Sequence, residues 1–355
     1  MLMSLNYLDI LYLNCLNQFG GERSPSAVYH LLKGKKSSQT IQDSKLFHLS
    51  NLFGMYPSLP REKFDADMKR LISEGYLYHD ENDAYVLTYS ANNVLVNTLN
   101  THPIPSSLNG TIYGSGGFVF WKRLMLITQV LSHDSSGSKK YLPVTKDERV
   151  LGWVKQFLKR STVSKKRLSE LIHNELLLQL QAFTKREAEI FVYRLTSHDR
   201  IGSTFEQLAE IFNEDADYIK ITFWNIIHRM MEQCMKPHSP FPMLFQMIRD
   251  LSKVNPLTES TSKTLQLIHL GKSLEEISNI RNLKHSTIED HVVEIALNDG
   301  TFDISMFLND DHLLIIADKI KELQTHQLRA VKEALHDEYS YFQIRLAFTR
   351  IRRQS

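Results

Sequence analysis

Lysine and arginine residues gather at several places along the chain, where their positive charges could bind the phosphates of nucleic acid. A cationic side chain neutralises a phosphate of nucleic acid and releases its counterions. The net charge is only +2, so these local groups, and not the chain as a whole, would have to attract nucleic acid. The candidate nucleic-acid-binding residues are Lys35, Lys36, Arg61, Lys63, Lys69, Arg70, Lys155, Lys159, Arg160, Lys165, Lys166, Arg167, Lys272, Arg281, Lys284, His285, Arg350, Arg352 and Arg353. The group between 155 and 167 is the densest, although an ordinary solvated helical face explains it equally well.

Patterns of catalytic or metal sites are missing from the sequence. The pair Gly34-Lys35 is no phosphate loop, because Tyr29 stands where that motif needs its first glycine. The fifteen histidines form neither a His-Glu-x-x-His run nor a pair with a nearby cysteine. We find no Ser-His-Asp constellation and no helicase motor motif. The sequence therefore predicts a non-enzymatic protein with no cofactor, no metal and no evident small-molecule substrate.

The most informative segment of the sequence is residues 261–308. Ser273 with Glu276, and Ser286 with Glu289, have the spacing of capping boxes, in which the hydroxyl and the carboxylate satisfy backbone N–H groups at a helix start. Gly271 is placed to end the preceding helix. Two capped helices joined by a short turn predict a helix-turn-helix.

In this module, 287–298 occupies the recognition position, yet its polar residues have the wrong charge for DNA. The side chains predicted to point outward are Thr287, Glu289, Asp290, His291 and Glu294. Three acids in this set repel phosphate, and the basic residues lie at the approach to the helix. The sequence leaves open whether the module touches the duplex with its rim or binds protein.

The other segments are also mostly helical, so we expect a mostly α, multi-domain fold with an N-terminal winged helix. Residues 1–100 form the winged-helix-like domain, with a helix at about 38–52, a recognition-position helix at 60–73 and then a hairpin. Residues 101–146 are a linker and connecting helix with a turn at 113–118. Residues 147–251 form a helical middle domain with a helix-turn-helix-like unit at 203–224. The C-terminal domain, 255–355, ends in a helical tail.

Composition favours a cytoplasmic protein. Two cysteines, Cys15 and Cys234, sit in apolar helical patterns, so a disulfide is not expected. No apolar run approaches the roughly 20 residues that a membrane helix needs. We predict a cytoplasmic location, with association with the nucleoid left open.

Residues 271–307 resemble the helix-turn-helix domain found at the C-terminus of RecQ-type helicases. The matching runs are G-x-S-x-E-E-I from Gly271, S-T-I-E-x-H from Ser286 and F-D-I-S-x-F from Phe302. The runs at 26–43, 71–78 and 241–251 extend the resemblance to the YpbB-like proteins of Firmicutes, stand-alone carriers of this domain that are typically encoded beside a RecQ-type helicase.

This resemblance implies a non-catalytic accessory of a RecQ-type helicase in DNA repair or recombination. The implied partners are DNA, duplex or forked, and the helicase itself. Two alternatives remain at this point. One is a transcription regulator that reads an operator with its winged helix, and the other is a scaffold that binds only protein.

Overall fold

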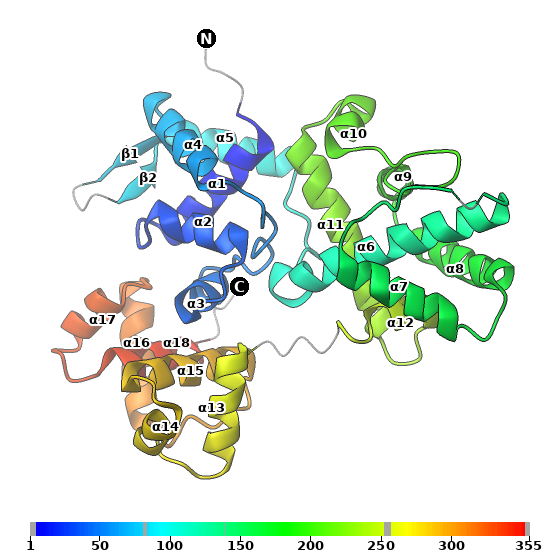
Figure 1. Ribbon diagram of the computed structural model, residues 1–355. Coiled ribbons are helices and arrows are strands. Elements are labelled where there is room, and N and C mark those ends of the chain that lie inside the picture. Colours follow the sequence, from blue (N-terminus) through cyan, green and yellow to red (C-terminus); the bar gives the residue numbers. More distant parts are fainter. Residues whose placement is uncertain (1–4, 81–83, 139, 252–256, 352–355) are drawn as a thin grey trace. The chain divides into compact units, whose positions relative to one another are not determined.

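A computed structural model describes residues 5–80, 84–138, 140–251 and 257–351 of the chain (Figure 1). These residues form eighteen α-helices and one two-stranded antiparallel sheet. Packing divides the chain into two compact units, Met1–Asn14 with Tyr89–Val254 and Cys15–Thr88 with Asn255–Ser355. The predicted mostly α, multi-domain fold is confirmed. The second unit joins two segments that are far apart in the sequence, whereas the four domains predicted above follow one another along the chain.

The N-terminal elements have the order of a winged helix. Gly75, with a φ of +75°, turns the chain from the fourth helix into the hairpin, where Leu77 pairs with Leu87. The unit boundary falls inside the first helix. The elements are α1 (Tyr7–Phe19), α2 (Pro25–Lys33), α3 (Ser38–Leu46), α4 (Arg61–Ser73), β1 (Leu77–His79) and β2 (Tyr85–Leu87).

The third helix is shorter than the predicted 38–52. Ser37 caps its start by accepting a hydrogen bond from the Thr40 N–H. The helix ends at Leu46 because His48 has a φ of +55°, which a right-handed helix cannot contain.

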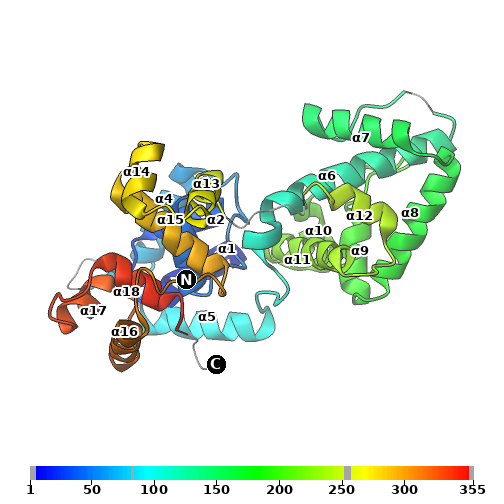
Figure 2. The ribbon, with the colours of Figure 1, turned by 90° about the horizontal axis from the view of Figure 1, so that it is seen from below.

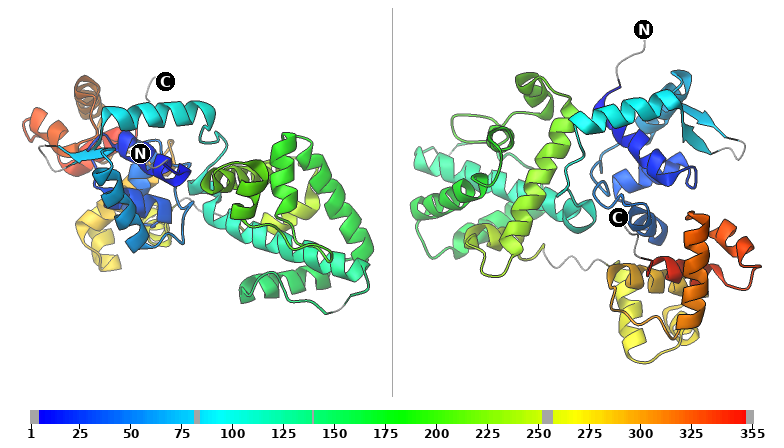
Figure 3. Two further views of the ribbon diagram at one scale, coloured as in Figure 1. Left: turned by 90° about the horizontal axis from the view of Figure 1, so that it is seen from above. Right: turned by 180° about the vertical axis from the view of Figure 1, so that it is seen from behind.

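The C-terminal part of the second unit is built around its third helix. The elements are α13 (Glu259–His269), α14 (Leu274–Arg281), α15 (His285–Asn298), α16 (Asp310–Leu323), α17 (Leu328–Ala334) and α18 (Tyr341–Phe348). Helix α15 packs against α13, α14, α18 and the N-terminal α3. Figure 3 shows the orange and red tail helices lying against the yellow ones. The core of this region contains Val292, Ile316 and Ile344, and Leu46 of α3 packs onto it.

One of the two predicted helix caps in this region is confirmed and the other is wrong. Ser273 and Glu276 form the capping box of α14. Helix α15 instead begins at His285, with Lys284 at the cap position and no side-chain cap. The helix starts early because the turn is tight: Asn282 has a φ of +50° and the Leu283 N–H donates to the Ser278 carbonyl. Ser286 is therefore already inside the helix.

The first unit is organised around two long helices, α6 and α11. Its elements are α5 (Tyr89–Thr101), α6 (Gly110–Ser135), α7 (Glu148–Arg160), α8 (Lys165–Leu180), α9 (Lys185–Tyr193), α10 (Phe205–Phe212), α11 (Ala216–Met235) and α12 (Pro242–Ile248). Helix α6 packs against α7, α8, α11 and α12 (Figure 2). The predicted helix-turn-helix-like unit is present as α10 and α11, capped by Thr204 and Asp215.

The predicted turn at 113–118 is wrong, because these residues belong to α6. Their glycines serve packing between helices instead of chain reversal. A Cβ atom on Gly117 would lie 3.3 Å from the ring of His228, and one on Gly116 would lie 3.3 Å from Met231 Cε. Glycine lets α6 approach α11 closely here, which a single-sequence pattern of turn residues does not reveal.

The His228 ring between these helices makes the stability of the protein depend on pH. His228 is fully buried, its Nδ1 accepts a hydrogen bond from the Asn109 N–H, and burial lowers its pKa to about 3. An unfolded histidine titrates near 6.5, so this contribution to stability is present above pH 6.5 and is lost as pH falls. Between pH 7 and 4.5, we expect the wild type to lose about 2–3 kcal/mol more than His228→Gln. Urea unfolding of both proteins at both pH values measures this difference, and equal losses would contradict it.

Candidate nucleic-acid interface

The helix in the recognition position of the C-terminal module, α15, is a core helix. His291 and Glu294, which were predicted to point outward, are buried, and that prediction is wrong. The Thr258 N–H and the Thr261 hydroxyl donate to the two Glu294 oxygens, at 2.6 and 2.7 Å. The Thr264 hydroxyl lies 2.8 Å from His291 Nδ1. These polar groups join α15 to α13, so they are not available to bases.

The N-terminal helix α3 covers a further part of α15. The Lys45 ammonium donates to the Leu297 carbonyl and to Asn298 Oδ1, at 2.8 and 2.7 Å. A lysine at the carboxyl end of a helix satisfies its last carbonyls. The end of α15 is therefore bound within the protein.

The basic residues at the approach to α15 mostly have intramolecular partners. The Arg281 guanidinium donates to the Ser260 carbonyl and to Thr264 Oγ1. Lys272 pairs with Glu276 at 2.9 Å, and His285 lies 3.5 Å from Glu289. Lys284 is exposed. Residues 274–298 carry five acids against two lysine or arginine residues, so the local charge opposes phosphate binding.

In the helix-turn-helix-like unit of the first unit, the second helix, α11, is also a core helix. Helix α11 is buried along most of its length, including Ile219, Phe223, Ile226 and Met230. It is the central helix of the first unit and packs against α6, α9, α10 and α12. It therefore offers no free face of its own to a DNA groove.

Helix α4 occupies the recognition position of the winged helix. Its outer face is exposed, but its basic side chains are matched by nearby acidic ones. Arg61 pairs with Asp65 and Lys63 with Asp67, each at 2.9 Å, and Arg70 lies 3.3 Å from Glu74. Residues 61–74 carry four basic and four acidic side chains. Lys69 is exposed and forms no ion pair with the residues that the structure describes. Phosphate would have to displace the ion pairs of the other three cations.

The remaining isolated candidates are spread along the second unit. Lys35 and Lys36 are exposed in the loop between α2 and α3. The Arg350 guanidinium donates to the Ala296 and Phe302 carbonyls and so holds the tail against α15. Arg352 and Arg353 lie outside the described residues.

The densest group of exposed cations lies on α7 and the first turn of α8. We call this set, Lys155, Lys159, Arg160, Lys165, Lys166 and Arg167, the α7–α8 basic surface. All six side chains are exposed. Residues 148–168 carry seven basic side chains against one acid, Glu148.

Two of these cations have partners. Lys165 pairs with Asp134, and Arg167 pairs with Glu170. Within the described part of the chain, the other four form no ion pair. A phosphate can therefore approach them without displacing a carboxylate, which distinguishes this surface from α4.

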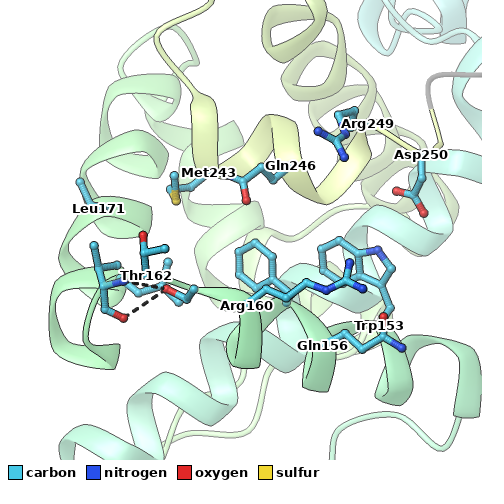
Figure 4. Close-up of a pocket in the computed structure, with 13 residues that line it drawn as sticks. Trp153, Gln156, Arg160, Thr162, Leu171, Met243, Gln246, Arg249 and Asp250 are labelled. Atoms are coloured by element: carbon cyan, nitrogen blue, oxygen red, sulfur yellow. Dashed lines mark hydrogen bonds between the residues drawn. The ribbon is translucent and has the colours of Figure 1, made fainter.

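A groove of about 620 Å³ adjoins this surface, between α7 and α12. Trp153, Phe157 and Arg160 line it from α7, Met243 lines it from α12, and Arg249 lines it from the position directly after α12. Figure 4 shows Trp153 and Arg160 facing Met243, Gln246 and Arg249 across the space. Sequence reasoning missed Trp153 and Phe157, although these aromatic residues are four positions apart and alternate with Lys155 and Lys159, which was a usable signal.

Among the described residues, no three His, Cys, Asp or Glu side chains come together in a way that could hold a metal ion. No helix in the same ranges is long and apolar enough to cross a membrane.

The sequence of this chain is similar to known proteins, and the similarity assigns it to a family. A helix-turn-helix domain model matches residues 260–348, the part built around α15. No solved structure matches the chain. Protein YpbB of Bacillus subtilis (strain 168) is 42% identical over 349 residues, which are 98% of this chain and 98% of that protein. With that identity along its whole length, the chain belongs to the YpbB family.

Proposed function

We propose that this protein is a non-catalytic, cytoplasmic DNA-binding accessory of a RecQ-type helicase, acting in DNA repair or recombination. The α7–α8 basic surface is the observation that carries the DNA-binding part. It supports contact with phosphates, because four of its cations lack carboxylate partners within the described residues. The helicase part rests on the resemblance of residues 271–307 to the domain that such helicases carry.

The two roles fall on different parts of the chain in this proposal. The α7–α8 basic surface holds DNA, and the acidic C-terminal helix-turn-helix docks protein. Leu270 at the end of α13 and Ile280 on α14 support the docking role, since their side chains are 73% and 58% exposed. Apolar residues at the surface of an acidic module suit a protein partner better than phosphate. Some helicases carry this domain in the same chain as their motor. In this proposal, a chain that has the domain but no motor supplies the domain's function to the helicase as a separate protein.

Charge reversal tests the DNA-binding part. The variant Lys155→Glu/Lys159→Glu/Lys166→Glu should weaken duplex binding about tenfold or more at 0.1 M salt, because it removes phosphate contacts and adds repulsion. The slope of log K against log[salt] should also become shallower by roughly 0.9 for each phosphate contact that is lost. Fluorescence anisotropy with a labelled duplex and a labelled fork measures both quantities.

The matched control reverses three exposed lysines elsewhere, Lys185, Lys263 and Lys321, and so changes the net charge equally. It should bind as the wild type does. If both triple variants weaken binding alike, only the overall charge matters and the α7–α8 basic surface is not the site. If the wild type does not bind DNA at low salt, the DNA-binding proposal fails.

The helicase part has a separate test. Purified RecQ-type helicase from the same organism should bind the wild type, and Leu270→Glu/Ile280→Glu should reduce that binding without changing affinity for DNA. Sequence-specific binding to an operator by a symmetric dimer would instead support a transcription regulator.

A further inference from the structure

We propose that the groove between α7 and α12 binds an unpaired base of single-stranded DNA, stacked on Trp153 and Phe157, while the α7–α8 basic surface holds the adjoining phosphates. The inference rests on the proposed DNA binding and specifies the form of DNA: a strand with accessible bases. Such strands occur at forks and at unwound ends.

The aromatic residues form a stacked pair that a base can extend. The Trp153 and Phe157 rings stack on each other, with an interplanar angle of 13° and centroids 5.2 Å apart. Both side chains line the groove and neither is fully buried. Stacking on aromatic side chains is the common way in which proteins hold single-stranded nucleic acid, because every base has a π face.

Trp153 is held in place before any ligand arrives. The Arg123 guanidinium carbon lies 4.0 Å from the centre of the Trp153 ring system. Arg123 is itself buried and fixed, since it donates to both Asp250 oxygens and to the Met247 carbonyl, each at 2.7 Å. A ring that is already ordered loses little entropy on binding, so its contacts contribute more to affinity.

The charges around the groove suit a nucleotide. Arg160 and Arg249 line it, and Lys159 and Lys166 lie on the adjoining surface. Asp250 is the one acid among the lining residues, and Arg123 neutralises it. An apolar peptide would gain from the aromatic pair but would offer no negative charge to Arg160, Lys159 and Lys166. A base with its phosphates satisfies both.

The paired bases of a duplex show only their edges, so they cannot stack on a protein ring without leaving the helix. A groove of about 620 Å³ can admit one base, but not a duplex. The geometry therefore predicts tighter binding of single strands than of duplex at the same salt concentration.

Intrinsic fluorescence gives a direct probe. The chain has three tryptophans, and Trp121 and Trp224 are buried. Titration of the full chain with an oligothymidylate of about twelve nucleotides should quench Trp153. Titration with a duplex of equal length should change the emission little. Trp153→Phe should abolish the quenching but keep most of the affinity, because phenylalanine still stacks.

Binding of variants separates the stacking contact from the phosphate contacts. Trp153→Leu and Phe157→Leu, each measured by anisotropy, should weaken binding of the oligothymidylate about tenfold. Duplex affinity should stay within about twofold. Tyr89→Leu, which removes an 83% exposed aromatic residue on α5, is the matched control and should change neither. Circular dichroism shows whether each variant is folded, and the Phe157 variant keeps the test valid if loss of Trp153 disturbs Arg123.

Three results would overturn the inference: single-strand affinity unchanged in both leucine variants, quenching by duplex equal to quenching by single strand, or no single-strand binding by a wild type that binds duplex. In each case, loss of duplex binding on charge reversal of the α7–α8 basic surface would still support the proposed function. No binding of either DNA form would overturn both.

Discussion

Replacing Ile288 by alanine should destabilise the second unit by about 2–5 kcal/mol, the usual cost of truncating a buried isoleucine. Ile288 lies in α15 and is fully buried. Its neighbours come from helices held on several sides of α15, so they cannot easily close the cavity. For a unit of this size, the midpoint of thermal unfolding should fall by roughly 5–20 °C.

Ile280→Ala is the matched control, because the same atoms are removed from a side chain that is 58% exposed on the adjacent helix α14. It should cost less than about 0.5 kcal/mol. Differential scanning calorimetry of the full chain compares the two variants. Equal effects would mean that α15 is not the central helix of this unit, and a free recognition helix would again be possible.

Replacing Glu294 by leucine should cost about 2–4 kcal/mol, although the wild-type residue is a carboxylate in an apolar region. Burial raises the pKa of Glu294, whereas hydrogen bonds from Thr258 and Thr261 lower it. Leucine removes both acceptors and leaves the Thr258 N–H and the Thr261 hydroxyl without their partner, at about 1–3 kcal/mol for each buried group. Glu294→Gln keeps a hydrogen-bonding side chain and should lose less.

Glu289→Leu is the control for this substitution, since both residues lie on α15 and both were predicted to face outward. Glu289 is half-buried, and among the described residues its one ion-pair contact, with His285, is 3.5 Å long. Its replacement should change the free energy of unfolding by less than about 1 kcal/mol. Urea unfolding measures all three variants, and an equal loss for Glu289→Leu and Glu294→Leu would contradict the buried hydrogen bonds of Glu294.

These two residues bear on function as well as on stability. A helix whose Ile288 and Glu294 both face neighbouring helices cannot lie in a DNA groove with those faces. In folded variants, Glu289→Leu should therefore leave DNA affinity unchanged. The proposed DNA site lies instead on α7 and α8, where four exposed cations form no ion pair within the described residues.

The local structure follows from short-range sequence patterns. The caps at Ser273, Thr204 and Asp215, the start of α2 at Pro25 and the hairpin after Gly75 depend on residues within a few positions of one another. Such short-range preferences act before any tertiary contact forms. The mostly α, multi-domain fold and the order of a winged helix followed by helix-turn-helix units could therefore be predicted.

Which faces of the helices are exposed depends on long-range packing. Periodicity distinguishes an apolar face from a polar one, but it cannot show that Thr258 and Thr261 would satisfy Glu294 or that α3 would cover α15. Those contacts join residues far apart in the sequence. The same limit applies to the cations: Arg281 and Lys155 look alike in sequence, yet one is bound to Ser260 and the other is exposed. The charge of a side chain is fixed by its type, whereas its availability to a ligand depends on what folds against it.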